Sequence, residues 1–297
     1  MRILVTGRHG QVAQSLAERA AHHEDLELLF AARPEVDLAQ AGAIAAAIES
    51  ARPDAVINAA AFTEVDRAED EPERAFRINA DAAGEAAAAA ARIGCPIIHL
   101  STDYVFDGMA KTPYGEGAAT NPLNVYGASK LLGEERVRAA SDRHLIVRTA
   151  WLVGPFGKNF VKTMLRLAGD RDEIKVVADQ FGCPTDTLML ADAILAIVRT
   201  WQAGAPDAGL GQTFHVAGKG ACSWADLARR VMATSVAAGG AGARIIDIPT
   251  SEYPTKAHRP AYSVLDTHLF ERSFDVVIPD WQVSIDAVVR RLVSDAR

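Results

Sequence analysis

A regular alternation of short apolar runs and helix-favouring segments in the first half of the chain constrains the fold more than any other feature. Buried strands are expected over the apolar runs, at residues 3–6, 26–31, 55–57, 96–101 and 145–148. Helices are expected between them, at residues 11–22, 44–51, 71–93 and 125–140. Because such alternation builds β-α-β units, the sequence predicts an α/β fold with a parallel sheet covered on both faces.

Composition narrows the class of protein. With 297 residues, of which 49% are hydrophobic, the chain can bury one large core with a smaller satellite. The net charge of −7 is spread without a basic stripe, which argues against a nucleic-acid partner. No apolar run approaches the ~18 residues of a membrane span, so no membrane partner is expected. Three scattered cysteines, without a C-x-x-C pair, indicate free thiols in a cytoplasmic protein and no metal site.

A glycine turn follows the first expected strand. Gly7 and Gly10 stand in the pattern G-x-x-G-x-x-A and open the first helix. Glycine there lets the backbone approach a pyrophosphate, which the helix N-terminus attracts. Arg33 lies just past the second strand, where an arginine suits the 2′-phosphate of NADP. The pattern predicts a Rossmann-type, doubly wound sheet that binds NADPH, with NADH as the alternative.

A second group of residues has the chemistry of a proton donor. Tyr126 and Lys130 are four residues apart, so on the expected helix they share one face. The ammonium of Lys130 is expected to lower the pKa of Tyr126 towards the working range. Thr102 stands at the end of the fourth strand, where ligands bind in open α/β sheets. Together these residues predict proton transfer to a carbonyl oxygen as a hydride reaches its carbon.

The alternation becomes irregular after about residue 155. Helices are expected at 159–168, 188–201, 223–234 and 284–293, and strands at 174–177, 214–216 and 244–248. A low-complexity loop is expected at 237–243. We therefore expect residues 1–155 to form a dinucleotide-binding domain that carries the Tyr/Lys pair. Residues 156–297 would mainly form a smaller α/β substrate-binding lobe, with some segments returning to the first domain.

Several stretches from end to end of the chain resemble one family, the dTDP-4-dehydrorhamnose reductases, which are extended short-chain dehydrogenases. The matching stretches are residues 5–12, 58–69, 101–108, 124–130, 148–151, 159–165, 179–185 and 259–263. The resemblance implies NAD(P)H-dependent reduction of the 4-keto group of dTDP-4-dehydro-L-rhamnose to dTDP-L-rhamnose. That product is a nucleotide sugar for lipopolysaccharide and other polysaccharides.

The resemblance also implies roles for individual residues. Beside Gly7 and Arg33, the cofactor would meet Gly10, Gln11, Val12, Asp37, Leu38, Ala61, Phe62 and Thr63. Thr102, Tyr126 and Lys130 match the catalytic trio, and the last two also face the cofactor. The sugar nucleotide would meet Thr102, Asp103, Trp151 and Arg259, the last as a guanidinium suited to the diphosphate.

Some positions depart from the family pattern. Ala13 replaces a frequent glycine, and Ala150 stands where serine is frequent, which suggests a small change in the sugar pocket. Some members bridge a homodimer through a metal held partly by a carboxylate of the first helix. Because this helix carries Gln14 and Ser15, a metal-linked dimer is not expected. A homodimer without that metal stays open, since the sequence does not determine the oligomeric state.

Other functions on the same fold stay open. A dehydratase needs an acidic pair near the carbonyl, and Thr102-Asp103 supplies one carboxylate. An epimerase would keep its NAD bound and would not oxidise added NADPH. A non-catalytic NADP-binding regulatory subunit is a further alternative, although such proteins tend to lose the side chains that Thr102, Tyr126 and Lys130 retain here. A reductase for a different deoxy-hexulose also fits.

Overall fold

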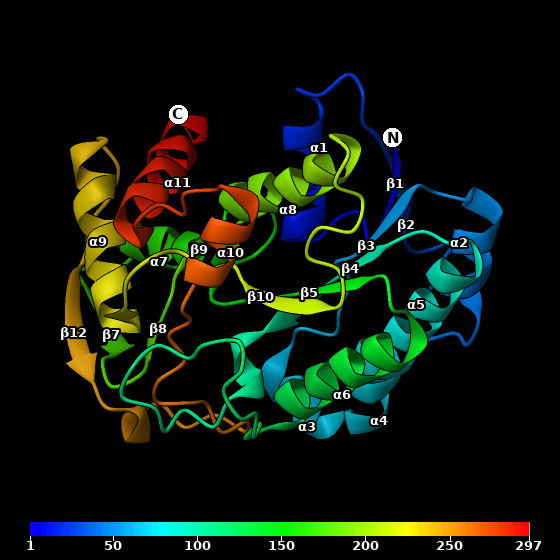
Figure 1. The fold of residues 1–297 in the computed structure, drawn as a ribbon. Helices are drawn as coiled ribbons and strands as arrows, with labels where there is room; N and C mark the ends of the chain where they lie inside the picture. Colours follow the sequence, from blue (N-terminus) through cyan, green and yellow to red (C-terminus); the bar gives the residue numbers. More distant parts are fainter. Residues whose placement is uncertain (297) are drawn as a thin grey trace.

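A parallel sheet of six strands runs through the larger part of the molecule (Figure 1). The structure, a computed structural model, describes residues 1–296. In spatial order the strands are β10 (Gln212–His215), β5 (His144–Thr149), β4 (Ile97–Thr102), β3 (Ala55–Asn58), β1 (Arg2–Thr6) and β2 (Glu27–Ala31). Every neighbouring pair is parallel, so the predicted α/β class is confirmed.

The central strands are mostly apolar because helices cover both faces of the sheet. Every residue of β3, β4 and β5 is buried. From β1 the chain first builds β2 on one side and then β3 on the other side. The carboxyl ends of β1 and β3 therefore border the switch point of the sheet, where open α/β folds bind ligands.

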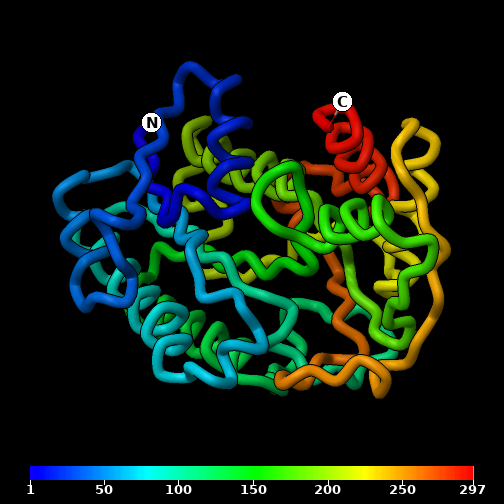
Figure 2. The backbone as a smooth tube through the Cα atoms, turned by 180° about the vertical axis from the view of Figure 1, so that it is seen from behind, coloured from blue at the N-terminus to red at the C-terminus, as the bar shows by residue number. Residues whose placement is uncertain are grey.

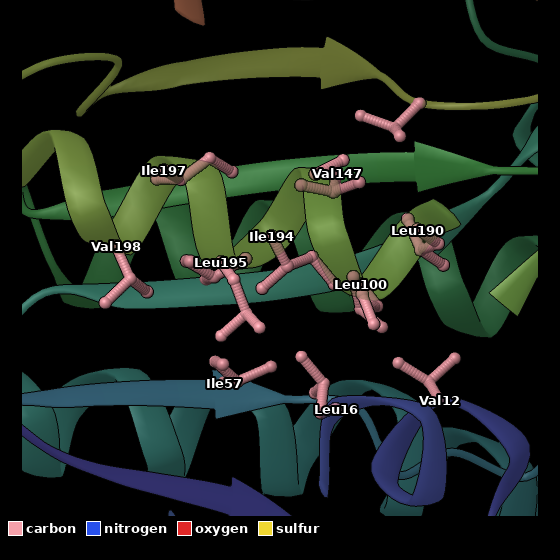
Figure 3. Packing of buried hydrophobic residues seen from close by; sticks show 14 of the residues in the cluster. Val12, Leu16, Ile57, Leu100, Val147, Leu190, Ile194, Leu195, Ile197 and Val198 are labelled. Carbon is pink, nitrogen blue, oxygen red and sulfur yellow. The ribbon is translucent and has the colours of Figure 1, made fainter. Parts of the chain in front are cut away.

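Helices α1 (Gln11–Ala20), α8 (Thr187–Gln202) and α10 (His268–Phe274) cover one face of the sheet. Figure 3 shows side chains of α8, such as Ile194, directed at the strands and towards Leu16 of α1. A buried hydrogen bond joins the hydroxyls of Ser15 and Thr187 at 2.8 Å where the two helices meet. Helix α8 belongs to the second half of the chain, yet it completes the core of the first.

Helices α2 (Ala43–Ala51), α5 (Ala82–Arg92) and α6 (Val125–Ala140) cover the opposite face. Alanine is the residue that lets α5 approach the sheet closely, and the buried ones are Ala82, Ala83, Ala86, Ala87, Ala89 and Ala90. High helix propensity and small volume thus act together in this helix.

The segment before α5 differs from the single helix expected over residues 71–93. The chain forms α3 (Val65–Asp70), α4 (Pro72–Phe76) and then a π-helical turn, η1 (Arg77–Asp81). Pro72 fits the first turn of α4 because its missing N–H would have no partner there. The π turn was not predicted, since it accompanies long-range contacts of Asn79 and not a local pattern.

A second lobe lies beside the sheet (Figures 1 and 2). Its strands form three pairs: β12 (Arg244–Ile248) with β7 (Glu173–Val177), β11 (Cys222–Ser223) with β8 (Phe181–Gly182), and β6 (Leu152–Val153) with β9 (Thr185–Asp186). Helices α7 (Phe160–Ala168), α9 (Trp224–Ala237) and α11 (Trp281–Asp295) surround a separate apolar core. Two short 3-10 turns, η2 (Asp103–Val105) and η3 (Thr250–Glu252), complete the elements.

The chain crosses between the two cores more than once. Strand β10 pairs with β5 at the edge of the large sheet, and α8 and α10 pack against its face. The expected domain boundary after residue 155 stays a prediction. These three elements come from the later half of the chain but lie on the large sheet. Within residues 1–296, every helix is too short or too polar to cross a lipid bilayer.

Candidate active site

The glycine turn leaves β1 at the switch point. Gly7 has a φ of +82°, and a Cβ placed on it would lie 3.2 Å from the Cβ of Ala60. Gly10 is the N-cap of α1, has open space where a Cβ would be, and supplies no side chain to cap the helix. The first turn of α1 contains no acidic residue. Backbone N–H groups and open space at this turn fit a pyrophosphate.

The side chains of Gln11 and Val12, the two residues after Gly10, both make contacts within the protein. Val12 is buried in the core beneath the sheet. The side-chain oxygen of Gln11 accepts a hydrogen bond of 2.9 Å from Asn159, the residue before α7. The side chain of Gln11 therefore ties the turn to the second lobe, while backbone atoms of the turn stay available to a ligand.

The adenosine end of the predicted site lies past β2. Arg33 is exposed, and no hydrogen bond or ion pair within residues 1–296 involves it. Asp37 accepts a hydrogen bond from the backbone N–H of Ala39 at 2.9 Å, and Leu38 packs against the apolar core. A residue that sequence reasoning missed is Arg8, whose guanidinium lies 5.7 Å from the ring centroid of Phe30 in β2. Its position directly after Gly7 was the available signal.

The segment after β3 is fixed by a buried amide. The side chain of Asn79 accepts a hydrogen bond of 2.7 Å from the Phe62 backbone N–H and donates one of 3.1 Å to the Phe62 carbonyl. It also donates to the Ser129 hydroxyl of α6 at 2.9 Å. Ala61 is partly exposed and Thr63 is exposed. Asn79, which the sequence did not reveal, thus links the predicted cofactor segment to the catalytic helix.

Thr102, Asp103 and Tyr126 come together where β4 ends and α6 begins. The Thr102 hydroxyl donates to an Asp103 carboxylate oxygen at 3.0 Å and is also hydrogen-bonded to Tyr126. Asn124 caps α6 by accepting a hydrogen bond from the Gly127 N–H at 2.8 Å. Because that cap fixes the first turn of α6, it also fixes Tyr126 in the second position of the helix.

The electrostatics of this cluster differ from the sequence expectation. Tyr126 is only partly exposed, and burial raises the pKa of its hydroxyl to about 12. The expected lowering by Lys130 was wrong, because desolvation outweighs any other influence on the phenol. Burial also raises the pKa of Asp103 to about 6. A tyrosine in this state is protonated at neutral pH, which is the form that donates a proton.

Lys130 is buried and lies about one turn after Tyr126 in the same helix. Its Nζ donates to the Leu100 carbonyl of β4 at 2.5 Å, and burial lowers its pKa to about 8. An ammonium has three N–H groups, and one of them meets Leu100. Within residues 1–296 the other two N–H groups make no hydrogen bond, which would leave them for hydroxyl groups such as those of a dinucleotide ribose.

Trp151 and Arg259 are the two remaining residues predicted to contact the sugar nucleotide. Trp151 lies just beyond β5 and packs against the apolar clusters of both lobes. Both terminal nitrogens of Arg259 bind Asp66 of α3, at 2.7 and 3.2 Å, and the guanidinium also bonds Tyr104. Arg259 therefore lies at the site, but part of its fork is already occupied by protein groups.

Metal ligands and reactive thiols are not features of this region. Within residues 1–296 no cluster of His, Cys, Asp or Glu has the arrangement to hold a metal ion. Cys95, Cys183 and Cys222 are free and buried, and burial raises the pKa of each thiol.

Comparison with known proteins identifies the family. Residues 1–294 match the family model described as RmlD substrate binding domain. The chain is 44% identical to a dTDP-4-dehydrorhamnose reductase of Sinorhizobium fredii, covering 100% of this chain and 99% of that protein.

Solved structures agree as well. A dTDP-4-dehydrorhamnose reductase of Clostridium acetobutylicum matches with a TM-score of 0.90 and 37% identity over 98% of this chain and 99% of that one. One of Bacillus anthracis, solved in complex with NADP, matches with a TM-score of 0.88 and 33% identity over 97% and 98%. The resemblance inferred from the motifs is confirmed, and the chain belongs to the dTDP-4-dehydrorhamnose reductase family.

Proposed function

We propose that this protein uses NADPH to reduce the 4-keto group of dTDP-4-dehydro-L-rhamnose, forming dTDP-L-rhamnose. The observation that carries the proposal is the hydrogen bond between Thr102 and Tyr126, with Lys130 of the same helix bound to Leu100 of β4. The sheet that holds these residues also carries the uncapped glycine turn at its switch point. That arrangement supplies a proton donor next to a dinucleotide site.

Each residue of the trio has a separate task in the reaction. The bound NADPH supplies the hydride. Tyr126 gives its hydroxyl proton to the substrate oxygen as negative charge develops there, and its high pKa keeps it protonated beforehand. Thr102 orients that hydroxyl, and Lys130 holds the ribose and adds positive charge below the developing oxyanion.

The rest of the site would bind and enclose the two ligands. The turn at Gly7, Gly10, Gln11 and Val12 would hold the pyrophosphate, with Arg33 at the 2′-phosphate. Asp37, Leu38, Ala61, Phe62 and Thr63 would line the remainder of the cofactor. Asp103 and Trp151 would meet the sugar, and Arg259 would use its free donors on the diphosphate. The second lobe would exclude water from the reacting carbon.

The test is a turnover assay with purified protein, NADPH and dTDP-4-dehydro-L-rhamnose generated in situ. We expect NADPH oxidation in step with formation of dTDP-L-rhamnose. Folded protein that binds NADPH but does not oxidise it would contradict the proposal and favour the epimerase or regulatory-subunit alternatives. Oxidation without that product would indicate a reductase for another deoxy-hexulose.

The expected setting is the cytoplasm, where NADPH is supplied and thiols stay reduced. We propose a homodimer that needs no bridging metal, since α1 carries Gln14 and Ser15 where a carboxylate ligand would be required. Light scattering in the presence of a chelator tests this: a mass that falls to one chain would contradict a metal-free dimer.

A further inference from the structure

Two tryptophan rings from different parts of the chain are stacked at the edge of the proposed sugar site. The ring centroids of Trp151 and Trp224 are 3.5 Å apart, and their planes are 5° from parallel. Phe160 of α7 contacts Trp224 in turn, with centroids 4.8 Å apart. Both tryptophans are partly exposed, so the stack reaches the surface of the site.

The backbone places Trp151 close to the catalytic strand. Thr149 ends β5 and is the register partner of Thr102 in β4, so Trp151 stands just beyond the proton-donor cluster. Trp151 has a φ of +45°, in the left-handed region that L-residues avoid. Contacts with the surrounding structure must hold the residue in that conformation.

The second lobe is built to receive the indole of Trp151. A Cβ on Gly182 would lie 2.4 Å from Cε2 of that ring, so only glycine leaves room for it. Gly182 of β8 pairs with Cys222 of β11, and Ser223 then caps α9 in a capping box with Asp226. Trp224 is the first residue of that helix, so strand pairing and cap together fix its ring.

We infer that Trp224 is a positioning residue, which holds the indole of Trp151 as a rigid wall for the sugar of the nucleotide substrate. The inference rests on the proposed function, because it takes Trp151 to meet the sugar. A ring that is already ordered loses little conformational freedom when the substrate binds. Without Trp224, the indole of Trp151 would have to be ordered by the substrate itself.

The test measures KM, kcat and NADPH affinity for Trp224→Leu and Trp224→Phe. Because an aromatic pair contributes about 0.5–1.5 kcal/mol, Trp224→Leu should raise KM for the sugar nucleotide roughly two- to tenfold. The affinity for NADPH and kcat should stay close to wild type, and Trp224→Phe should restore most of the lost KM. An unchanged KM in Trp224→Leu would overturn the inference.

A spectroscopic signal reports the geometry without turnover. Stacked indoles give an exciton couplet in the ultraviolet circular dichroism spectrum, which we expect in wild type and not in Trp224→Leu. Trp201→Phe is the matched control, since Trp201 is buried in α8 on the other core and should leave both couplet and KM unchanged. A couplet that survives Trp224→Leu would show that the assigned stack is wrong.

A double-mutant cycle separates an action through Trp151 from direct contact with the substrate. If Trp224 acts through Trp151, the pair Trp151→Leu and Trp224→Leu should have the KM of Trp151→Leu alone. Additive effects would overturn the positioning role. Gly182→Ala, which pushes on the indole while Trp224 stays, should raise KM in the same way. Wild-type turnover is measured first, so failure of the proposed function is seen separately.

Discussion

The catalytic end of the sheet and the second lobe differ in how deeply their ion pairs are buried. Arg148 of β5 binds Glu134 of α6 at 2.8 Å, with only 4% and 0% of the two side chains exposed. In the second lobe, Arg244 pairs with Glu173 while 70% and 55% of those side chains are exposed. Both regions have apolar cores, and the second lobe also contains the stacked indoles.

The difference in burial bears on the pKa values and on the tolerance to substitution of the two regions. At the catalytic end, burial sets the direction of the pKa shifts of Tyr126 and Lys130, while Thr102 and Glu134 act in the opposite direction. Although burial alone would raise it, the guanidinium of Arg148 holds the pKa of Glu134 below its usual value. The exposed ion pairs of the second lobe contribute little to stability, so substitution there should be tolerated.

The largest expected effect comes from removing the proton donor. Tyr126→Phe should lower kcat by roughly a hundredfold or more, because general-acid catalysis contributes about 10²–10⁴-fold. NADPH binding, measured by fluorescence titration, should stay near wild type. Tyr114→Phe is the matched control, since its hydroxyl bonds Asp107 and is not part of the trio. Near-normal turnover of Tyr126→Phe would remove the proton donor from the proposal.

Removing one partner of the buried Arg148–Glu134 pair should lower the free energy of unfolding more than removing one partner of the exposed Arg244–Glu173 pair. Glu134→Gln leaves Arg148 buried without its counter-charge, which should cost about 3–5 kcal/mol of the free energy of unfolding. Glu173→Gln in the exposed pair should cost about 0–1 kcal/mol. Urea unfolding of both variants measures the contrast. Equal losses would mean that the two regions are not stabilised as differently as their burial indicates.

Asp103 should make the catalytic end less stable as pH rises. Its folded pKa of about 6 is above the ordinary 3.8, so the protonated form is favoured in the folded state. Its stabilising contribution is therefore fully present below pH 3.8 and is lost as pH rises through about 6. The change corresponds to ~3 kcal/mol. Unfolding of Asp103→Asn should lack this loss, so its stability advantage over wild type should grow between pH 4 and 7; a constant difference would contradict the shift.

The smallest effect is expected at the exposed adenosine end. Arg33→Ser should weaken NADPH binding about tenfold and leave NADH binding unchanged, because one charged hydrogen bond to the 2′-phosphate is lost. Arg171→Ser, also exposed but in the second lobe, is the control. Titration with both nucleotides decides the matter. An equal loss for NADH would assign Arg33 to another part of the cofactor.

Much of the fold was predictable where apolar runs are long. The five strands expected in the first half all form in one parallel sheet, and α6 occupies the expected residues 125–140. Elements that depend on distant partners were missed. Strands β6, β8, β9 and β11 have two residues each, too few for any periodicity. Helix α10 has seven residues and was missed although Phe270 and Phe274 stand four positions apart.

The residues of the candidate site also differ in how far the sequence alone could reveal them. The sequence was enough to propose Thr102, Tyr126 and Lys130, and the structure brings Thr102 and Tyr126 into hydrogen-bonding contact. The contacts of Asn79 with Phe62 and of Trp224 with Trp151 could not be predicted, since the partners lie far away in sequence. The prediction for the pKa of Tyr126 was wrong for a related reason. A lysine four residues away can be seen in the sequence, whereas the burial that raises this pKa depends on the whole fold.

The return of α8 and β10 to the large sheet has a consequence for how such proteins diverge. A chain cut after residue 155 would lose the helix that covers one face of the sheet and the strand at its edge. Recombination that joins one relative's first half to another's second half must therefore match a core as well as a substrate. A chimera joined at that point should collect in the insoluble fraction unless α8 travels with the sheet it covers.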